Sequence, residues 1–319
     1  MSMRNVPAIS VVIGALLLLA ALTGAASAQS VVKTKTSHCS VGSGPEFPGY
    51  DPVTHTMYIP NAHSSTITVL KGTCTLVGTI TLASPAYPVA AAFDASNNYM
   101  YVTDYSLNQV YEISGTTVKA VIAGFDNPWG ITYDPGDSVM AVANTGGDTV
   151  SFVSGSVVTV TDPVGNNPFG IGYDPYWATV LVTNFGSGNV TILNALNLTH
   201  VADVPVGDGP YGVAFDPATD DDYVTNSLSN NVTVMTGLGA PAGTISGFHG
   251  PTGIAWSQAT LHLYVANDHT DKVYTISGLS VVAKKTIASG TDGLGVAYDE
   301  ANDKVYVTIF SSDKVYVLS

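Results

Sequence analysis

The sequence of 319 residues is poor in basic side chains, above all in arginine. Arg4 is its only arginine, and nine lysines stand against 24 acidic residues, of which 21 are aspartate. Binding to nucleic acid or to an anionic membrane needs a basic surface that neutralises phosphates, so we expect neither partner. The scarcity of basic groups also limits positive self-repulsion in acid, and this predicts a fold suited to an acidic medium.

Several signatures of catalysis and of metal or cofactor binding are missing as well. The chain has no P-loop and no G-x-S-x-G sequence, and none of its seven histidines forms an H-x-x-x-H or H-E-x-x-H pair. The run Asp220-Asp221-Asp222 matches no EF-hand loop, and we interpret it as a solvated acidic turn. The sequence therefore predicts no metal and no cofactor, and it singles out no catalytic residue.

Long apolar runs are confined to the N-terminus. Arg4 precedes an apolar run from Ile9 to Leu22, and Ala26-Ser27-Ala28 forms an A-x-A cleavage site. This pattern is typical of a signal peptide over residues 1–28, with the mature chain starting at Gln29. No second apolar run follows, so we expect a secreted or cell-surface protein without a membrane span in its mature chain.

A repeat covers the rest of the chain. An aromatic-Asp pair ends at Asp51, and its later copies follow at intervals of 43, 40, 40, 42, 41 and 42 residues. A second motif ends ten residues after each of these positions, as in Tyr101-Val-Thr-Asp104, Leu181-Val-Thr-Asn184 and Tyr223-Val-Thr-Asn226. The motif departs from its pattern in two places, where Ser257 replaces Asp and Ile309 replaces Asn, and we expect altered turns there.

Each repeat contains four short β-branched runs separated by turn residues. In the fourth repeat these runs are 169–173, 180–183, 190–193 and 200–206. Four strands in about 40 residues are typical of a propeller blade, so residues 29–319 predict an all-β, seven-bladed β-propeller rather than a sandwich or a solenoid. The last repeat stops after its third strand, and Val31 to Thr36 would supply the missing outer strand and close the ring.

These motifs, with the preceding Asn167-Pro-Phe-Gly170 and Gly209-Pro-Tyr-Gly212, resemble those of the YVTN family of β-propeller repeat proteins. The resemblance covers residues 31–319. It implies an exported or surface-layer setting, and it implies no particular activity.

The starts of the innermost strands converge around the axis of a propeller and predict a ligand-binding mouth. Aromatic residues occupy this position in three neighbouring blades, and polar or charged residues lie near it, so we expect binding by stacking and hydrogen bonds. The predicted mouth consists of Glu46, Trp129, Phe169, Tyr211, Asp126, Asp208, His249 and Asp292. Alternatively, the aromatics pack between blades as core. The loops after the second motif should open on the same face, bringing Tyr105, Phe185, Phe310, His63 and His269.

The Asp of each aromatic-Asp pair has a structural interpretation. It begins the turn between the first two strands, where an Asp accepts a hydrogen bond from a backbone N–H two residues further on.

Three N-x-Thr sequences, at Asn189, Asn197 and Asn231, match the N-glycosylation pattern, which matters only in an organism that glycosylates exported proteins.

The chain has only two cysteines, which in an exported protein would form a disulfide. The repeat alignment argues against this bond. It aligns Cys39 with Leu82, eight positions beyond Cys74, which is about 26 Å along a strand, whereas a disulfide needs Cα atoms within about 7 Å. Either Cys39 and Cys74 are not bonded, or the closing strand is misplaced.

Three functions remain open. The main prediction is a non-catalytic binding or adhesion module at the cell surface, with an extracellular protein or a glycan as its ligand. The second is a structural component of a surface layer or extracellular matrix, formed by self-association. The third is a propeller lyase or hydrolase resembling the streptogramin lyases, with His249-Gly250 at its site.

Overall fold

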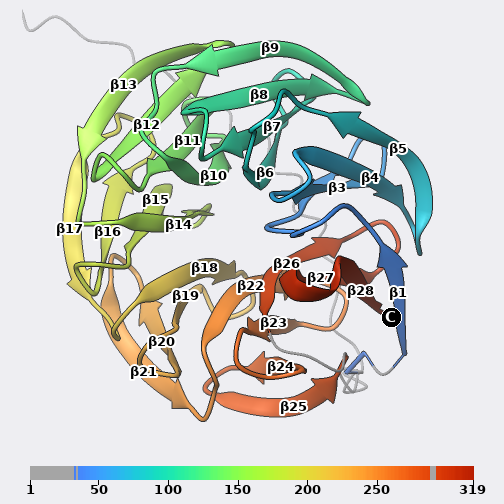
Figure 1. The fold of residues 1–319 in the computed structure, drawn as a ribbon. Coiled ribbons are helices and arrows are strands. Elements are labelled where there is room, and N and C mark those ends of the chain that lie inside the picture. The colour runs from blue at the N-terminus through green and yellow to red at the C-terminus, as the bar shows by residue number, and fades with distance from the viewer. Residues whose placement is uncertain (1–31, 34, 288–291) are drawn as a thin grey trace, which may run out of the picture. The chain divides into compact units, whose positions relative to one another are not determined.

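Short β-branched runs and intervening turns fold into a ring of blades in the computed structural model, which describes residues 32–33, 35–287 and 292–319. The described chain forms seven four-stranded antiparallel sheets. Figure 1 shows these sheets arranged around a central axis. The predicted seven-bladed β-propeller is thus confirmed, and the sandwich and solenoid alternatives are excluded. The predicted signal peptide with its cleavage after Ala28 lies outside the described residues.

The first three blades follow one another along the chain, and each runs from its innermost to its outermost strand. Their strands are β2 (Gly49–Asp51), β3 (Thr56–Asn61), β4 (Thr66–Lys71) and β5 (Thr75–Thr81); β6 (Pro88–Asp94), β7 (Tyr99–Asp104), β8 (Gln109–Ser114) and β9 (Thr117–Ala123); and β10 (Pro128–Asp134), β11 (Val139–Asn144), β12 (Thr149–Ser154) and β13 (Val157–Pro163).

The next three blades repeat this order. Their strands are β14 (Pro168–Asp174), β15 (Thr179–Asn184), β16 (Asn189–Asn194) and β17 (His200–Pro205); β18 (Pro210–Asp216), β19 (Asp221–Asn226), β20 (Asn231–Thr236) and β21 (Ala240–Ser246); and β22 (Pro251–Ser257), β23 (His262–Asn267), β24 (Lys272–Ser277) and β25 (Ser280–Thr286).

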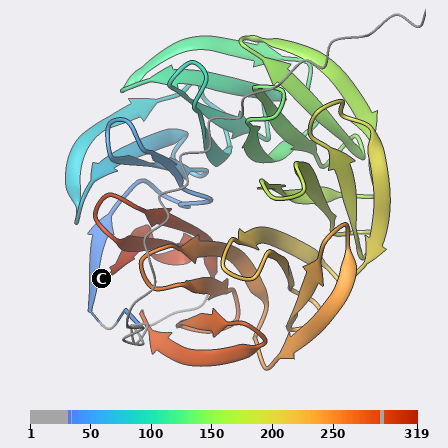
Figure 2. The ribbon, with the colours of Figure 1, turned by 180° about the vertical axis from the view of Figure 1, so that it is seen from behind.

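The seventh blade combines the two ends of the described chain. It contains β26 (Gly293–Asp299), β27 (Lys304–Ile309), β28 (Lys314–Leu318) and, as its outer strand, β1 (Thr36–Ser40). Strand β1 pairs antiparallel with β28, from Thr36 opposite Leu318 to Ser40 opposite Lys314. Figure 2 shows the first and last blades side by side. Closure by an N-terminal strand is confirmed, but the strand begins at Thr36 instead of ending there as predicted.

The Tyr and Thr of the second motif link several blades to the next one. In the fifth blade the Tyr223 hydroxyl donates to the Gly278 carbonyl, 3.2 Å away, and the Thr225 hydroxyl donates to the Thr252 carbonyl at 2.6 Å, both in the sixth blade. The Asn226 amide donates to side chains of the following strand of its own blade. The motif residues therefore satisfy hydrogen bonds that the fold requires, which explains why the motif recurs at fixed spacing.

The Asp of the aromatic-Asp pair forms the predicted turn. Asp51 Oδ1, for example, accepts a hydrogen bond from the Val53 N–H at 2.8 Å, and the same contact recurs in the second to fifth blades. The turn after Ile309 is altered as expected, because a short 3₁₀ helix, η1 (Phe310–Ser312), follows it. The alteration expected at Ser257 is not found, because the Leu261 N–H donates to the Ser257 carbonyl at 2.9 Å as Asn98 does to Asp94.

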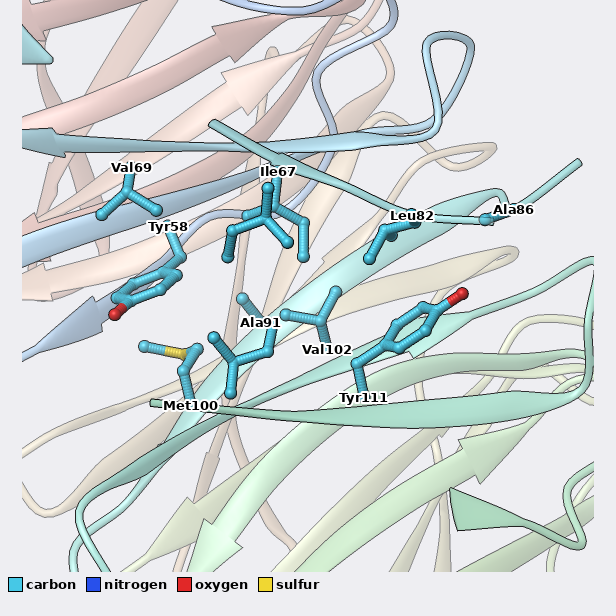
Figure 3. Packing of buried hydrophobic residues seen from close by; sticks show 11 residues of the cluster. Tyr58, Ile67, Val69, Leu82, Ala86, Ala91, Met100, Val102 and Tyr111 are labelled. Atoms are coloured by element: carbon cyan, nitrogen blue, oxygen red, sulfur yellow. The ribbon is translucent and has the colours of Figure 1, made fainter. Parts of the chain in front are cut away.

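Apolar side chains pack between adjacent blades rather than inside one sheet. Between the first and second blades, Ile67 and Val69 face Met100 and Val102, with Tyr58 at one side, and all five are at most 1% exposed. Figure 3 shows this layer, which comes from strands of both blades. Each blade therefore depends on its neighbour for burial of its apolar face.

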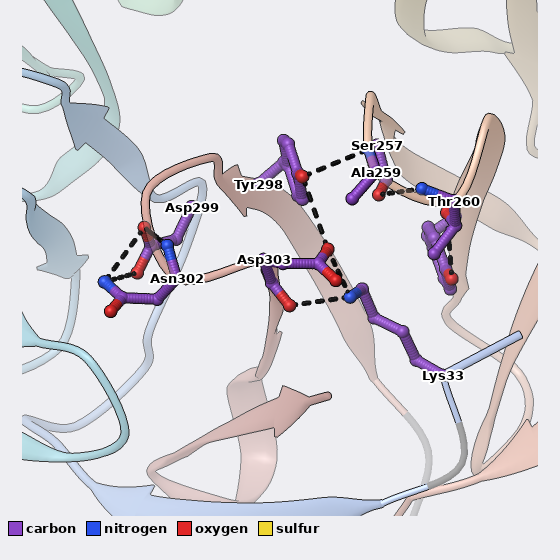
Figure 4. A network of polar contacts seen from close by, with 9 residues as sticks. Lys33, Ser257, Ala259, Thr260, Tyr298, Asp299, Asn302 and Asp303 are labelled. Carbon is purple, nitrogen blue, oxygen red and sulfur yellow. Dashed lines mark hydrogen bonds and ion pairs between the residues drawn. The ribbon is translucent and has the colours of Figure 1, made fainter. Parts of the chain in front are cut away.

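Lys33 anchors the chain just before the closing strand. Its ammonium lies 2.5 Å from the Asp303 Oδ1 and 2.6 Å from the Asp303 carbonyl, and the lysine side chain is almost fully buried. Figure 4 shows that Asp303 also accepts from Tyr298. This contact fixes the N-terminal segment to the seventh blade through side chains as well as through the β1–β28 ladder.

Cys39 and Cys74 form a disulfide, with Cα atoms 5.4 Å apart. The argument from repeat alignment against this bond was therefore wrong. The pairing of Cys39 with Val315 aligns it with Ile80, which pairs with Ile67 in the first blade, rather than with Leu82. This two-residue correction removes only about 7 Å of the expected separation.

Blade twist accounts for the rest. The same relation occurs between the fourth and fifth blades, where Gly239 corresponds to Cys74 and Val204 to Cys39. A Cβ on Gly239 would lie only 2.2 Å from Val204 Cγ2. Because strands rotate across each blade, the outer hairpin of one blade lies against the end of the outer strand before it. A distance counted along aligned strands therefore does not give the separation of the two cysteines.

The acidic run in the fifth blade is only partly solvated. Asp222 lies within β19, is 3% exposed and has an Oδ1 without a hydrogen-bond partner. The interpretation of Asp220-Asp221-Asp222 as a solvated turn is thus wrong for its last residue.

Among the three N-x-Thr asparagines, Asn197 is exposed in the β16–β17 turn, whereas Asn189 and Asn231 accept hydrogen bonds from Asn184 and Asn226.

Candidate functional site

Three aromatic side chains meet where the inner strands of the third, fourth and fifth blades begin. Each follows the first proline of its strand, so the three occupy equivalent positions around the axis. The ring centroids of Trp129 and Phe169 are 4.8 Å apart, and those of Phe169 and Tyr211 are 5.1 Å apart. All three residues are partly exposed and line the central cavity, and Trp129 also packs against the core between the second and third blades.

Loop residues extend this aromatic surface around the mouth. The Phe185 ring lies 5.1 Å from Phe169, and the Tyr105 ring lies 5.4 Å from Trp129. The contacts continue through Tyr87 at 6.1 Å from Tyr105 and His63 at 6.0 Å from Tyr87. The predicted opening of these loops on one face is confirmed.

Two aromatic members of the mouth were missed in the sequence. Tyr87 precedes the first proline of its inner strand, and Phe47 follows Glu46. The Phe47 ring reaches across the axis to 5.8 Å from Tyr211. A residue-by-residue comparison of the repeats could have found Phe47, because glycine occupies this position in most other blades, at 130, 170, 212, 253 and 295.

Behind the aromatic residues lies a cavity of about 170 Å³, lined by the first residues of the inner strands. Glycine is required here by close approach between strands. A Cβ on Gly170 would lie 2.0 Å from the Tyr211 carbonyl oxygen, and one on Gly130 would lie 2.3 Å from that of Phe169. The glycines therefore allow neighbouring inner strands to approach closely around this cavity.

Glu46 is the buried carboxyl group of the mouth. It is 2% exposed, its Oε1 accepts from the Tyr87 hydroxyl at 3.4 Å, and its Oε2 has no partner. Burial raises the pKa of Glu46 to about 8, although the Tyr87 hydrogen bond opposes this shift. The Trp129 Nε1 is also buried without a partner. The mouth thus presents one unpartnered oxygen and one unpartnered N–H.

A second polar group lies at the rim of the sixth and seventh blades. The His269 Nε2 is 3.5 Å from the Asp268 Oδ2, and the His269 N–H donates to the His249 carbonyl. Burial, and the nearby Asp292 carboxyl, raise the pKa of Asp268, whereas His269 lowers it. Sequence reasoning missed Asp268, which directly follows the Asn of the second motif.

Tyr211 lies between the two polar groups. Its pKa is raised well above the usual value by burial of its hydroxyl, and then by the negative charges of Glu46 and Asp268. Both carboxyl groups therefore act on the same phenol from different blades. The remaining predicted residues, Asp126 and Asp208, lie in exposed loops before β10 and β18. They contribute to the rim rather than to the buried part of the mouth.

Among the described residues, no three His, Cys, Asp or Glu side chains are arranged to hold a metal ion. No described helix is long and apolar enough to cross a membrane.

Solved structures with the same ring include lyases. The virginiamycin B lyase of Staphylococcus aureus matches with a TM-score of 0.78 and 13% identity, covering 89% of this chain and 99% of that chain. A catalytically inactive histidine-to-alanine variant of that enzyme, with quinupristin, gives 0.79 and 12%, covering 89% and 99%. A streptogramin B lyase gives 0.77 and 11%, covering 89% and 97%. At these identities the likeness shows the fold alone.

No protein-family model and no curated protein sequence matches the chain. The solved structures nevertheless correct the main functional prediction. They are enzymes of the same fold, so they speak against the predicted non-catalytic binding or adhesion module and agree better with the lyase alternative.

Proposed function

We propose that the protein is an enzyme of the propeller-lyase kind, with its reaction centre at the mouth. The observation that carries this proposal is the pairing of His269 with Asp268 beside His249, on the face where the aromatic residues and Glu46 also gather. The lyase structures add support, because one of them is a catalytically inactive histidine-to-alanine variant.

An elimination needs a base that removes a proton and an acid that protonates the leaving group. Histidine serves either role near neutral pH. In this proposal His269 is the base, because the Asp268 carboxylate at 3.5 Å orients its ring and stabilises the imidazolium that forms. His249, whose backbone carbonyl accepts from the His269 N–H, is the acid that donates a proton to the leaving group. The aromatic residues hold the apolar part of the substrate against the mouth.

Turnover tests the assignment. We expect His269→Ala and His249→Ala each to lower kcat/KM by about 100-fold or more, since loss of a general acid or base typically costs that much. Virginiamycin B, quinupristin and a panel of other esters serve as substrates. Elimination gives products whose summed mass equals that of the substrate, whereas hydrolysis adds one water.

A matched control comes from the fourth blade. The His200 Nε2 lies 3.1 Å from the Asp203 Oδ2, so it forms a similar exposed His–Asp pair on an outer strand. His200→Ala should leave turnover unchanged. A protein that leaves every compound intact, or a His249, His269 double variant with full activity, would contradict the proposal.

We also propose that the chain is an exported member of the YVTN family. Its disulfide supports export, because such bonds persist in oxidising compartments. The conserved hydrogen-bonding roles of the Tyr, Thr and Asn residues support the family resemblance. Mass spectrometry of the protein recovered from the medium should find a chain that begins at Gln29. A secreted chain that still carries residues 1–28, or retention inside the cell, would refute export by this signal.

A further inference from the structure

We propose that the mouth binds an organic ammonium group of a small molecule between the Glu46 carboxylate and the aromatic faces of Tyr87, Trp129 and Tyr211. This inference names the ligand chemistry of the mouth, and it rests on the proposed function only for the statement that such a ligand is a substrate. Binding itself is measured without turnover.

The unpartnered oxygen of Glu46 is the first observation. Its side chain is almost completely buried, yet Oε2 has no hydrogen-bond partner. A buried carboxylate without a partner is costly, so burial favours the neutral acid. A cation placed against Oε2 would supply the missing partner and would make the carboxylate the favoured form.

The surrounding aromatic rings supply the second observation. The Tyr87 hydroxyl contacts Glu46, and Tyr211 is close enough to feel its charge. Trp129 joins this group through Phe169, with centroid distances of 4.8 and 5.1 Å along the row. Aromatic faces around a carboxylate attract methylated ammonium groups through their quadrupoles, and tryptophan and tyrosine do so best.

Charge at the mouth agrees with a cationic ligand. Asp268, Asp292, Asp126 and Asp208 surround the opening, and the protein carries a formal charge of −14. None of the mouth residues named above is lysine or arginine. A negative, partly enclosed opening concentrates cations and repels anions.

The unpartnered buried polar atoms of the mouth argue against a sugar as its ligand. A glycan presents several hydroxyl groups that require partners, whereas Glu46 Oε2 and Trp129 Nε1 are the only unpartnered buried side-chain atoms among the described mouth residues. The Trp129 N–H would be satisfied by an oxygen of the ligand near its ammonium group. A small amine with a neighbouring oxygen, such as choline, therefore fits the mouth.

Calorimetry with the mature full-length chain tests the proposal. Choline and tetramethylammonium are titrated in parallel with the uncharged isostere of choline, in which a tert-butyl group replaces trimethylammonium, and with oligosaccharides. We expect both cations to bind and the isostere to bind about 10-fold more weakly or worse, because it lacks the cation–aromatic and ion-pair attraction. Equal binding of choline and its isostere, binding of sugars alone, or no binding of either cation would overturn the proposal.

Proton release gives an independent readout. Tyr87 and Tyr211 face Glu46, and the pKa values of both phenols are raised, to about 12 for Tyr87, so they stay neutral at pH 7. Asp268 acts on Tyr211 from the far side. Because burial raises the pKa of Glu46 to about 8, a bound cation should expel about one proton at pH 7. Titrations in two buffers of different ionisation enthalpy measure this number.

Variants complete the test. Glu46→Gln should weaken cation binding by about 10-fold and abolish proton release. Asp203→Asn, on the outer strand β17 of the fourth blade, serves as the matched control and should retain both. Melting curves confirm that each variant is folded, and unchanged affinity in a folded Glu46→Gln protein would overturn the proposal. Cation binding without turnover would leave this inference standing and count against the proposed function, whereas turnover without cation binding would do the reverse.

Discussion

Replacing Cys39 and Cys74 together by serine is expected to lower the free energy of unfolding by about 4 kcal/mol, for a cross-link that closes a loop of this length. The two residues are 35 positions apart, and their bond ties β1, the closing strand of the seventh blade, to the outer hairpin of the first blade. The contacts that close the ring between the two ends of the described chain are non-covalent. They include the β1–β28 ladder, the Lys33–Asp303 ion pair and the hydrogen bond from Tyr306 to Gly72.

Repeat symmetry offers a control that separates the covalent bond from packing. Cys39→Val with Cys74→Gly reproduces the Val204–Gly239 contact of the fourth and fifth blades. Cys74 has a φ of +67°, in the region that favours glycine, so this pair of changes also relieves backbone strain. We expect this variant to lose less stability than the serine variant and to be insensitive to reductant.

Chemical denaturation with and without dithiothreitol measures these differences. The wild-type protein should lose stability on reduction, whereas neither double variant should respond. If the serine variant and the wild-type protein unfold at the same denaturant concentration, then the disulfide adds nothing to the anchoring of the closing strand, and the prediction is wrong.

The fold could be predicted because the same local requirements recur in every repeat. Asp51 and its equivalents form turns, and Tyr223, Thr225 and Asn226 illustrate bonds that need the same residue at the same spacing. Such contacts involve only residues of one repeat and of the next. They do not depend on how far the blades twist, and so the strand pattern and the number of blades follow from the sequence.

The parts that were missed depend on geometry between blades or on a single departure from the repeat. The disulfide depends on blade twist, which brings Cys74 to a residue aligned six positions away. Phe47 and Tyr87 each replace a different residue type in one blade only. The burial of Glu46 requires Tyr87 and Tyr211 from other blades. The aromatic positions were predictable, but the reaction was not, because an aromatic mouth suits an enzyme as well as an adhesion module.

The second large effect that we expect is on the pH dependence of stability, and it comes from the buried Asp222. In the other six blades an apolar residue stands at this position, namely Met57, Met100, Met140, Val180, Leu263 and Val305. Burial, followed by the charges of Asp174 and Asp221, raises the pKa of Asp222 to about 8. The Asp174 Oδ2 is likewise buried without a partner. The interface of the fourth and fifth blades thus contains two carboxyl groups where its equivalents contain an apolar contact.

A carboxyl group whose pKa is higher in the folded than in the unfolded state binds its proton more tightly when folded. Its stabilising effect is complete below the unfolded pKa, near 4, and is lost as the pH rises towards the folded pKa of about 8. Glu46, with its pKa of about 8, acts in the same direction. The protein should therefore be more stable at acidic than at neutral pH, in agreement with the acidic-medium prediction from its composition.

Asp222→Met should remove one of these contributions by restoring the apolar residue of the other blades. At pH 7 the wild-type protein loses on the order of 4 kcal/mol of stability relative to pH 4 through this single group. The variant should lack that loss, so its advantage over the wild-type protein should grow from pH 4 to pH 8. Urea unfolding across this range measures the difference, with Asp208→Asn as the exposed-carboxylate control. Wild-type and Asp222→Met stability curves that run parallel over the range would show that Asp222 titrates normally, and the buried-acid account of the interface would then be wrong.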